Sequence, residues 1–177
     1  MRKANQAALA SAKNNDGPFA AVILQIDDKT GEVIRYWVAH NQVTQRHDPT
    51  AHAEVMTIRE AARDLGVLNL GHINKQESAL PQPSTWSHCI IYSSAEPCPM
   101  CMAAIYWSGM NRLYFAATRY DARAKGVNFS DALIYSELER PYTARQHMTT
   151  GHVVTNNALD AFNYYKRNPV PRYGEIN

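Results

Sequence analysis

Four residues in two short motifs have the chemistry of a hydrolytic metal centre. His52 and Glu54 lie in His-Ala-Glu, and Cys98 and Cys101 lie in Pro-Cys-Pro-Met-Cys. One imidazole and two thiolates supply three ligands to a catalytic zinc ion, whose fourth position stays open for water. Glu54 then remains available to transfer protons. These residue types predict one Zn2+ per chain, held by His52, Cys98 and Cys101, with Glu54 as the catalytic acid and base.

The spacing of the motifs predicts that both lie at helix N-termini. Cys98 and Cys101 are three residues apart and can share a helix face, and the prolines beside Cys98 suit a first helical turn. The positive end of that helix favours thiolates. His52 and Glu54 are only two residues apart, but at a helix start both side chains can lean over the end. We therefore expect two helix N-termini to meet at one metal ion.

Other interpretations of these motifs have to be weighed. A Cys-x-x-Cys pair alone can be a redox site, but a redox site needs no His-x-Glu upstream. A structural zinc site would take a fourth Cys or His, and the remaining cysteine, Cys89, precedes Ile-Ile-Tyr and is expected to be an inert, buried strand residue. A zinc-stabilised binding protein is the non-enzymatic alternative, but it has no use for Glu54 beside the metal. The catalytic interpretation is favoured.

Composition limits the possible classes of protein. The chain has 177 residues, 45% of them hydrophobic, with 18 Lys and Arg against 16 Asp and Glu and a formal net charge of +2. This suggests a single domain over 1–177 and gives no electrostatic footprint for nucleic acid. No apolar run is long enough for a membrane span, and the N-terminal residues lack a signal peptide's apolar core. Three cysteines, two of them assigned to metal, favour a reducing, cytoplasmic location.

Strands and helices alternate in the hydrophobic pattern, which predicts an α/β fold with a sheet covered on both faces. The near-continuous apolar run of the second strand, 33–39, predicts burial on both of its faces. The Pro-containing, polar stretch 68–87 predicts an exposed surface loop. The expected strands are 20–25, 33–39, 89–93, 112–117 and 148–155, and the expected helices are 4–14, 52–65, 98–107, 120–127 and 158–166.

The two motifs and their surroundings resemble the cytidine-deaminase-like superfamily, and within it the bacterial guanine deaminases. The resemblance runs from about residue 14 onward and is carried by 14–19, Asn41, 48–55, 97–101, 104–107 and 131–135. It implies a three-layer α/β/α sandwich with a central five-stranded mixed sheet. It also implies a homodimer in which the C-terminal segment 156–177 can cross to complete the partner's pocket.

The resemblance also implies residues that bind the substrate. Asn41 would donate a hydrogen bond to the carbonyl edge of a base, and Asp131 would accept bonds from its ring N–H and amino groups. From the sequence alone, Asn41 can equally be a turn residue and Asp131 a helix cap. The backbone amide of Ala53, at the start of its helix, would help to orient the attacking water. The aromatic residues available around a base are Phe19, Trp107, Phe129 and, in the C-terminal tail, Tyr173.

The expected reaction is deamination of a small-molecule nucleobase, most specifically guanine to xanthine and ammonia. Another base or ring, such as cytosine, isocytosine or an aminotriazine, is the first alternative. A tRNA adenosine deaminase is the second, although it expects a basic tail and the last ten residues contain one Arg, one Glu and no Lys. A pocket that uses a carboxylate to accept bonds from guanine should reject adenine.

Overall fold

The computed structural model describes residues 1–168. It divides the chain into two units: the first spans Met1–Ser130, and the second begins at Asp131. The first contains the sheet and both motifs, and the second contains α6 (Ala132–Leu138), the short η1 (Tyr142–Ala144) and α7 (Asp160–Arg167). The single-domain organisation expected from the sequence stays a prediction.

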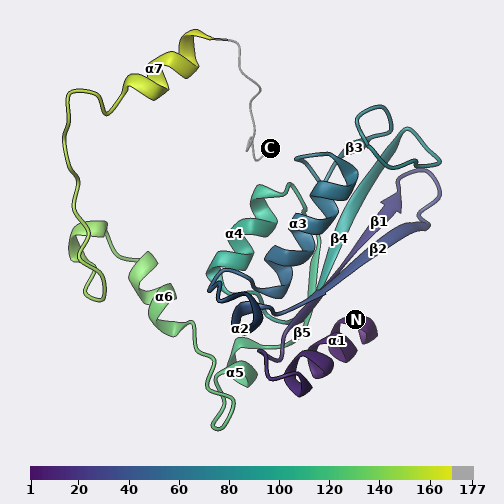
Figure 1. Cartoon of the computed structure of the whole chain (residues 1–177), viewed down its shortest axis with the longest axis horizontal. Coiled ribbons are helices and arrows are strands. Elements are labelled where there is room, and N and C mark those ends of the chain that lie inside the picture. The colour runs from purple at the N-terminus through teal and green to yellow at the C-terminus, as the bar shows by residue number, and fades with distance from the viewer. Residues whose placement is uncertain (169–177) are drawn as a thin grey trace. The chain divides into compact units, whose positions relative to one another are not determined.

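Five strands form one mixed sheet in the first unit (Figure 1). β1 (Ala20–Asp27) lies between β2 (Val33–His40) and β4 (Trp86–Ala95) and is antiparallel to both. On the other edge of β4, β3 (Ile73–Asn74) pairs antiparallel near its start and β5 (Leu113–Ala117) pairs parallel near its end. This mixed five-stranded sheet confirms the expected α/β fold class.

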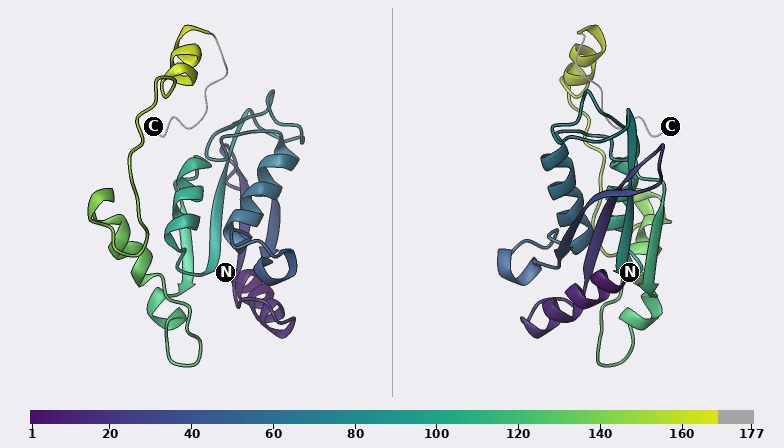
Figure 2. Two further views of the ribbon diagram at one scale, coloured as in Figure 1. Left: turned by 60° about the vertical axis from the view of Figure 1, so that its left-hand side comes forward. Right: turned by 90° about the vertical axis from the view of Figure 1, so that its right-hand side faces the viewer.

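Helices lie on both faces of the sheet. In β2, Trp37 donates a hydrogen bond to Asp64 of α3 (Ala53–Leu65), with 3.0 Å between Nε1 and Oδ2. The neighbouring Tyr36 lies under the ammonium group of Lys3 in α1 (Arg2–Lys13), 4.7 Å from the ring centre. Because adjacent strand residues point to opposite faces, α3 and α1 cover opposite faces of the sheet. α4 (Pro99–Trp107) packs beside α3, as the views in Figure 2 show.

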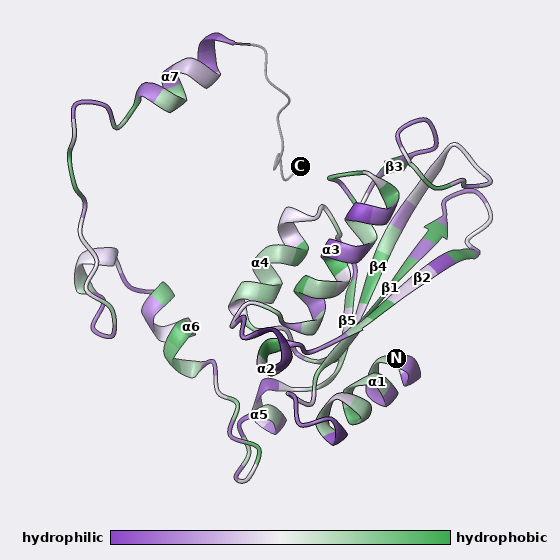
Figure 3. Cartoon of the chain, viewed as in Figure 1, coloured by the Kyte–Doolittle hydropathy of each residue, from purple (hydrophilic) through white to green (hydrophobic). Residues whose placement is uncertain are grey.

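The main core lies between the sheet and the α3 and α4 pair. Ile23 and Ile91 face each other across β1 and β4, and both are fully buried with Leu65 of α3 and Ile105 of α4. Figure 3 shows that α4 is coloured as hydrophobic along most of its length, whereas α3 has hydrophilic turns on its outer side. This core fixes the two helices against the sheet, and with them the two N-termini that carry the motifs.

Two strand predictions were wrong in detail. β2 is an edge strand with exposed Val33 and Tyr36, not a strand buried on both faces, because apolar content alone does not distinguish an edge strand from a central one. Residues 148–155 form no strand, and Val153 and Val154 are 77% and 81% exposed. The sheet is instead completed by β3, Ile73–Asn74, which is too short to give a periodic pattern.

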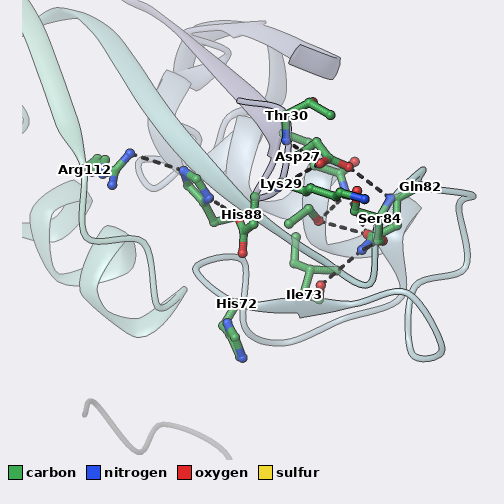
Figure 4. A network of polar contacts seen from close by, with 12 residues as sticks. Asp27, Lys29, Thr30, His72, Ile73, Gln82, Ser84, His88 and Arg112 are labelled. Carbon is green, nitrogen blue, oxygen red and sulfur yellow. Dashed lines mark hydrogen bonds and ion pairs between the residues drawn. The ribbon is translucent and has the colours of Figure 1, made fainter. Parts of the chain in front are cut away.

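The stretch 68–87 is not simply an exposed loop. Leu70 and Ile73 are fully buried in the core. Gln82 is also buried, and its side-chain amide donates to the carbonyl groups of Ile73, Ser84 and Thr85. Figure 4 shows this polar network beside the β1–β2 turn. The stretch is therefore anchored to the sheet at both apolar and polar points.

The remaining helices are short. α2 (Val43–Arg46) follows β2, and α5 (Arg119–Ala122) follows β5 with a capping box between Thr118 and Asp121. The helix expected at 120–127 is thus confirmed only in its first turn, whereas α7 agrees with the helix expected at 158–166. Within residues 1–168, the structure contains no helix with the length and hydrophobicity to cross a membrane.

Candidate zinc centre

The three expected ligands come together in the first unit. Nδ1 of His52 lies 3.5 Å from Sγ of Cys98 and 3.5 Å from Sγ of Cys101, and all three ligand atoms lie within 4.8 Å of one another. A tetrahedral zinc ion with Zn–N of about 2.05 Å and Zn–S of about 2.3 Å would hold nitrogen and sulfur about 3.6 Å apart. The observed spacing and the N/S donor set therefore fit a three-ligand zinc site, which leaves the fourth position for water.

Both motifs lie at helix N-termini, as the spacing predicted. His52 is the N-cap residue of α3, and Cys98 is the N-cap residue of α4, with Pro99 at its first position. The Cys98 sulfur accepts a hydrogen bond from the backbone N–H of Cys101, with 3.5 Å between the atoms. The first amides of both helices, including that of Ala53, lack partners within their helices. The positive ends of two helices thus point at the site and favour anionic sulfur.

The thiol groups of Cys98 and Cys101 have pKa values shifted in opposite directions. A hydrogen bond from Cys101 lowers the pKa of Cys98 to about 4, with His52 adding to the effect against the opposing effect of burial. The pKa of Cys101 is raised because Cys101 donates to Cys98, is buried and lies beside Glu54. The directions of the two shifts make Cys98 the thiol that loses its proton first, and zinc ligation requires both sulfurs to be deprotonated.

Glu54 lies at the first turn of α3 and is 6% exposed. Burial raises the pKa of its carboxyl group above the ordinary value of 4.5, against hydrogen bonds from its own backbone N–H and from Ser93. The Ser93 hydroxyl donates to Oε1 of Glu54 over 3.0 Å. A buried carboxylate with a raised pKa beside a metal cluster has the properties of a general base.

Asn41 lies in the loop after β2 and is 5% exposed. Its Oδ1 accepts a hydrogen bond from the N–H of Val43 over 3.0 Å, so its donor end, Nδ2, points the other way. A Cβ atom on Gly17 would lie 3.1 Å from that Nδ2, so the glycine leaves room for the amide. The next residue, Gln42, donates its N–H to the Ala51 carbonyl, which ties this loop to the chain just before His52.

Two of the expected aromatic residues pack against each other. The rings of Phe19 and Phe129 meet edge to face with centroids 5.0 Å apart. The carbonyl of Phe19 accepts the N–H of Asn41, which brings this pair beside the Asn41 loop. Trp107, in contrast, is the last residue of α4, six residues beyond Cys101, and is 60% exposed. The roles of all three in substrate binding stay predictions.

Asp131, another expected substrate residue, lies outside the first unit. Asp131 is the N-cap residue of α6, but its side chain makes no capping hydrogen bond. This differs from the alternative in which Asp131 serves as a helix cap. Tyr173 lies outside the described residues.

Sequence reasoning missed two residues next to the site. Ser93, a fully buried residue of β4, bonds Glu54, and the available signal was a small polar residue inside an apolar strand. Glu96 precedes Pro97, and its carboxylate accepts the N–H of Arg119 over 2.9 Å, which ties α5 to the cysteine loop. The expected role of Cys89 is supported: it is fully buried, and burial raises the pKa of its thiol to about 12.

Comparison with known proteins identifies the family. The model for the cytidine and deoxycytidylate deaminase zinc-binding region matches residues 1–117, which include every candidate ligand. The chain belongs to this deaminase family. It is thus a zinc-dependent hydrolytic deaminase, and the cluster of His52, Cys98 and Cys101 is its candidate zinc site.

Relatives within the family have more than one named activity. Guanine deaminase of Bacillus subtilis (strain 168) is 40% identical over 129 residues, which are 73% of this chain and 67% of that protein. The X-ray structure of guanine deaminase from Bacillus subtilis superposes with a TM-score of 0.77 at 33% identity, covering 98% of this chain and 95% of that one. The tRNA-specific adenosine deaminase of Aquifex aeolicus (strain VF5) is 32% identical over 117 residues, which are 66% of this chain and 63% of that protein.

Proposed function

We propose that this deaminase converts guanine and water to xanthine and ammonia. The likeness to Bacillus subtilis guanine deaminase, 40% in sequence and nearly full-length in structure, supports guanine over other bases. The observation that carries the proposal is the fixed amide of Asn41, in a loop that Gln42 ties to the residue before His52. With its oxygen bonded to Val43, the side chain offers a donor, which a 6-oxo group can accept.

The protein's own residues supply the proton transfers. Bound zinc, held by His52, Cys98 and Cys101, supplies Lewis acidity that makes water nucleophilic near neutral pH. Glu54 takes a proton from the attacking water and gives it to the ring nitrogen. It then takes the proton of the newly added hydroxyl and gives it to the leaving amine, so that the carbonyl forms as ammonia departs. Because Glu54 is almost fully buried, bulk water cannot readily replace it in either transfer. The first amide of α3, that of Ala53, would help to orient the attacking oxygen.

Recognition of the base would be shared between an amide and a carboxylate. Asn41 would donate to the 6-oxo group, and Asp131 would accept from the ring N–H and the 2-amino group. Phe19 and Phe129, which pack against each other, would wall the ring, with Trp107 and Tyr173 as further aromatic candidates. A base without the matching N–H groups would leave a carboxylate unpaired, so adenine should be a poor substrate.

An ammonia-release screen tests the proposal. The zinc-loaded protein is given guanine, adenine, cytosine, isocytosine, an aminotriazine and a tRNA, and guanine should react fastest. In a second arm, Asn41→Asp keeps an acceptor for Val43 but removes the donor, and should cost about 10²-fold in kcat/KM for guanine. Deamination of cytosine or a triazine with guanine untouched would overturn the substrate assignment and leave the reaction class intact.

The tRNA-specific relative makes RNA the second candidate substrate. Phosphate contacts weaken with salt, so tRNA binding that falls steeply between low and physiological salt would favour it. The net charge of +2 argues for a small-molecule base. A zinc-stabilised binding protein remains the outcome if the folded, zinc-loaded chain releases ammonia from no substrate.

We further propose a homodimer in which segment 156–177 crosses to the partner and Tyr173 closes its pocket. Light scattering at micromolar concentration should give the mass of two chains, and a monomer would contradict this. A guanine deaminase of this kind would act in purine catabolism. Its thiolate ligands suit the reducing cytoplasm.

A further inference from the structure

Glu54, the proposed proton carrier, is contacted by one polar side chain of β4 in the part of the chain that the structure describes. That side chain is the hydroxyl of Ser93. Ser93 lies opposite Ala21 of β1, two residues along from the Ile91–Ile23 pair. Since strand side chains alternate, Ser93 points to the face covered by α3. There its Oγ donates to Oε1 of Glu54 over 3.0 Å, and the residue is 1% exposed.

We propose that Ser93 is a positioning residue for deamination, holding one carboxylate oxygen of Glu54 so that the other faces the reacting groups. This inference rests on the proposed role of Glu54. The terminal torsion of a Glu side chain is broad, so the carboxylate plane needs a partner to fix it. Ser93 supplies that partner from β4, a central strand that pairs with β1, β3 and β5.

Proton transfer makes this orientation important. Glu54 must receive a proton from one direction and deliver it in others, and small misplacements of reacting groups carry large rate penalties. A neutral hydroxyl donates a hydrogen bond without adding a proton to the site or removing one. Ser93 can therefore donate to Oε1 whether Glu54 is ionised or carries a proton on its other oxygen.

The neighbouring Ser94 provides a matched control. It lies on the same strand, is also buried, and accepts the N–H of Ala20 over 3.0 Å. Ser94→Ala and Ser93→Ala therefore each remove one buried hydroxyl and one hydrogen bond. Only Ser93→Ala removes a contact with Glu54.

The test uses the full zinc-loaded chain and the base that the wild-type protein deaminates fastest. For Ser93→Ala we expect kcat to fall about 10- to 100-fold, with KM changed by less than about threefold and zinc content unchanged. Ser93→Thr, which keeps the hydroxyl, should restore most of kcat. Ser94→Ala should lose stability comparably, measured by thermal unfolding, and keep kcat within about threefold of wild type.

A double variant separates positioning from a general structural effect. In the Glu54→Ala background, Ser93→Ala should cause no further loss of the residual rate, because nothing is left to position. Equal kcat losses in Ser93→Ala and Ser94→Ala, loss of zinc, or an undiminished effect of Ser93→Ala without Glu54 would each overturn the inference. Full activity of Glu54→Ala, or no ammonia from any base with wild type, would overturn the proposed function and this inference with it.

Discussion

Glu54→Gln is the sharpest perturbation of the proposed chemistry. The substitution preserves the shape of the side chain and an acceptor for the Ser93 hydroxyl, but removes the group that carries protons. Glu54 is not one of the three clustered ligands, so zinc content should stay at about one ion per chain. The variant therefore separates proton transfer from metal binding.

The expected loss follows from the burial of Glu54. General acid–base catalysis contributes about 10²- to 10⁴-fold, or about 2.7–5.5 kcal/mol of barrier. Glu54 is proposed to act in both the attack and the departure steps, and at 6% exposure its place is hardly accessible to bulk water. We therefore expect a loss in kcat at the upper end of that range, about 10⁴-fold.

The free energy of unfolding of Glu54→Gln should not fall, in contrast to its kcat. The pKa of Glu54 is raised by burial, so the folded state disfavours the ionised carboxylate. Gln is neutral at all pH values, so the zinc-free variant should be at least as stable as the zinc-free wild type at neutral pH.

Three measurements check these expectations: ammonia release, zinc analysis and thermal unfolding. Glu60→Gln on the same helix is the matched control and should leave all three unchanged. A Glu54→Gln protein that deaminates at the wild-type rate, or that has lost its zinc, would refute the role assigned to this carboxylate.

Three other changes have definite expected outcomes. Cys98→Ser should lose zinc by metal analysis, since it replaces a thiolate ligand, and retention of a full zinc complement would contradict the site. Asp131→Ala should lower guanine turnover far more than it lowers the thermal midpoint or zinc content; equal effects would indicate a structural role. Asp27 is fully buried, and although burial alone raises its pKa, hydrogen bonds from Ser84, Thr30 and Lys29 lower it below 3.8. The ionised Asp27 carboxylate therefore stabilises the fold above pH 3.8, and this stabilisation is lost as the pH falls through the lower pKa of the folded protein. Asp27→Asn should be less stable than wild type at pH 7 and equally stable in acid. Denaturant unfolding at pH 7 and at acid pH measures both differences.

The sequence was sufficient to predict the metal cluster because its determinants are local. Prolines around Cys98, a three-residue cysteine spacing and a His-x-Glu at a helix start each restrict the backbone within one turn. Two helix N-termini with fixed ligands then follow, and the structure brings those ligands together. The apolar strands and the turn after β1 were predictable for the same reason.

The errors arose where the outcome depends on distant partners. β2 has the composition of a central strand, yet only β1 pairs with it in the described sheet. Residues 148–155 have apolar residues at strand-like spacing, but a strand requires a partner, and no strand of the described residues pairs with them. Ile73–Asn74 pairs with β4 although two residues carry no periodic signal.

The Ser93–Glu54 contact depends on how the strands of the sheet are aligned. The two residues are 39 positions apart and come from a strand and a helix with no shared local pattern. Their meeting depends on the register that sets Ser93 opposite Ala21, and on the packing of α3 over that face of the sheet. A slip of one residue between β1 and β4 would turn Ser93 to the opposite face and bring Ser94 toward Glu54. The burial of Ile91 opposes that slip, because the same slip would turn Ile91 out of the core and away from Ile23. The same apolar residues that stabilise the fold therefore fix the orientation of the group proposed to carry protons.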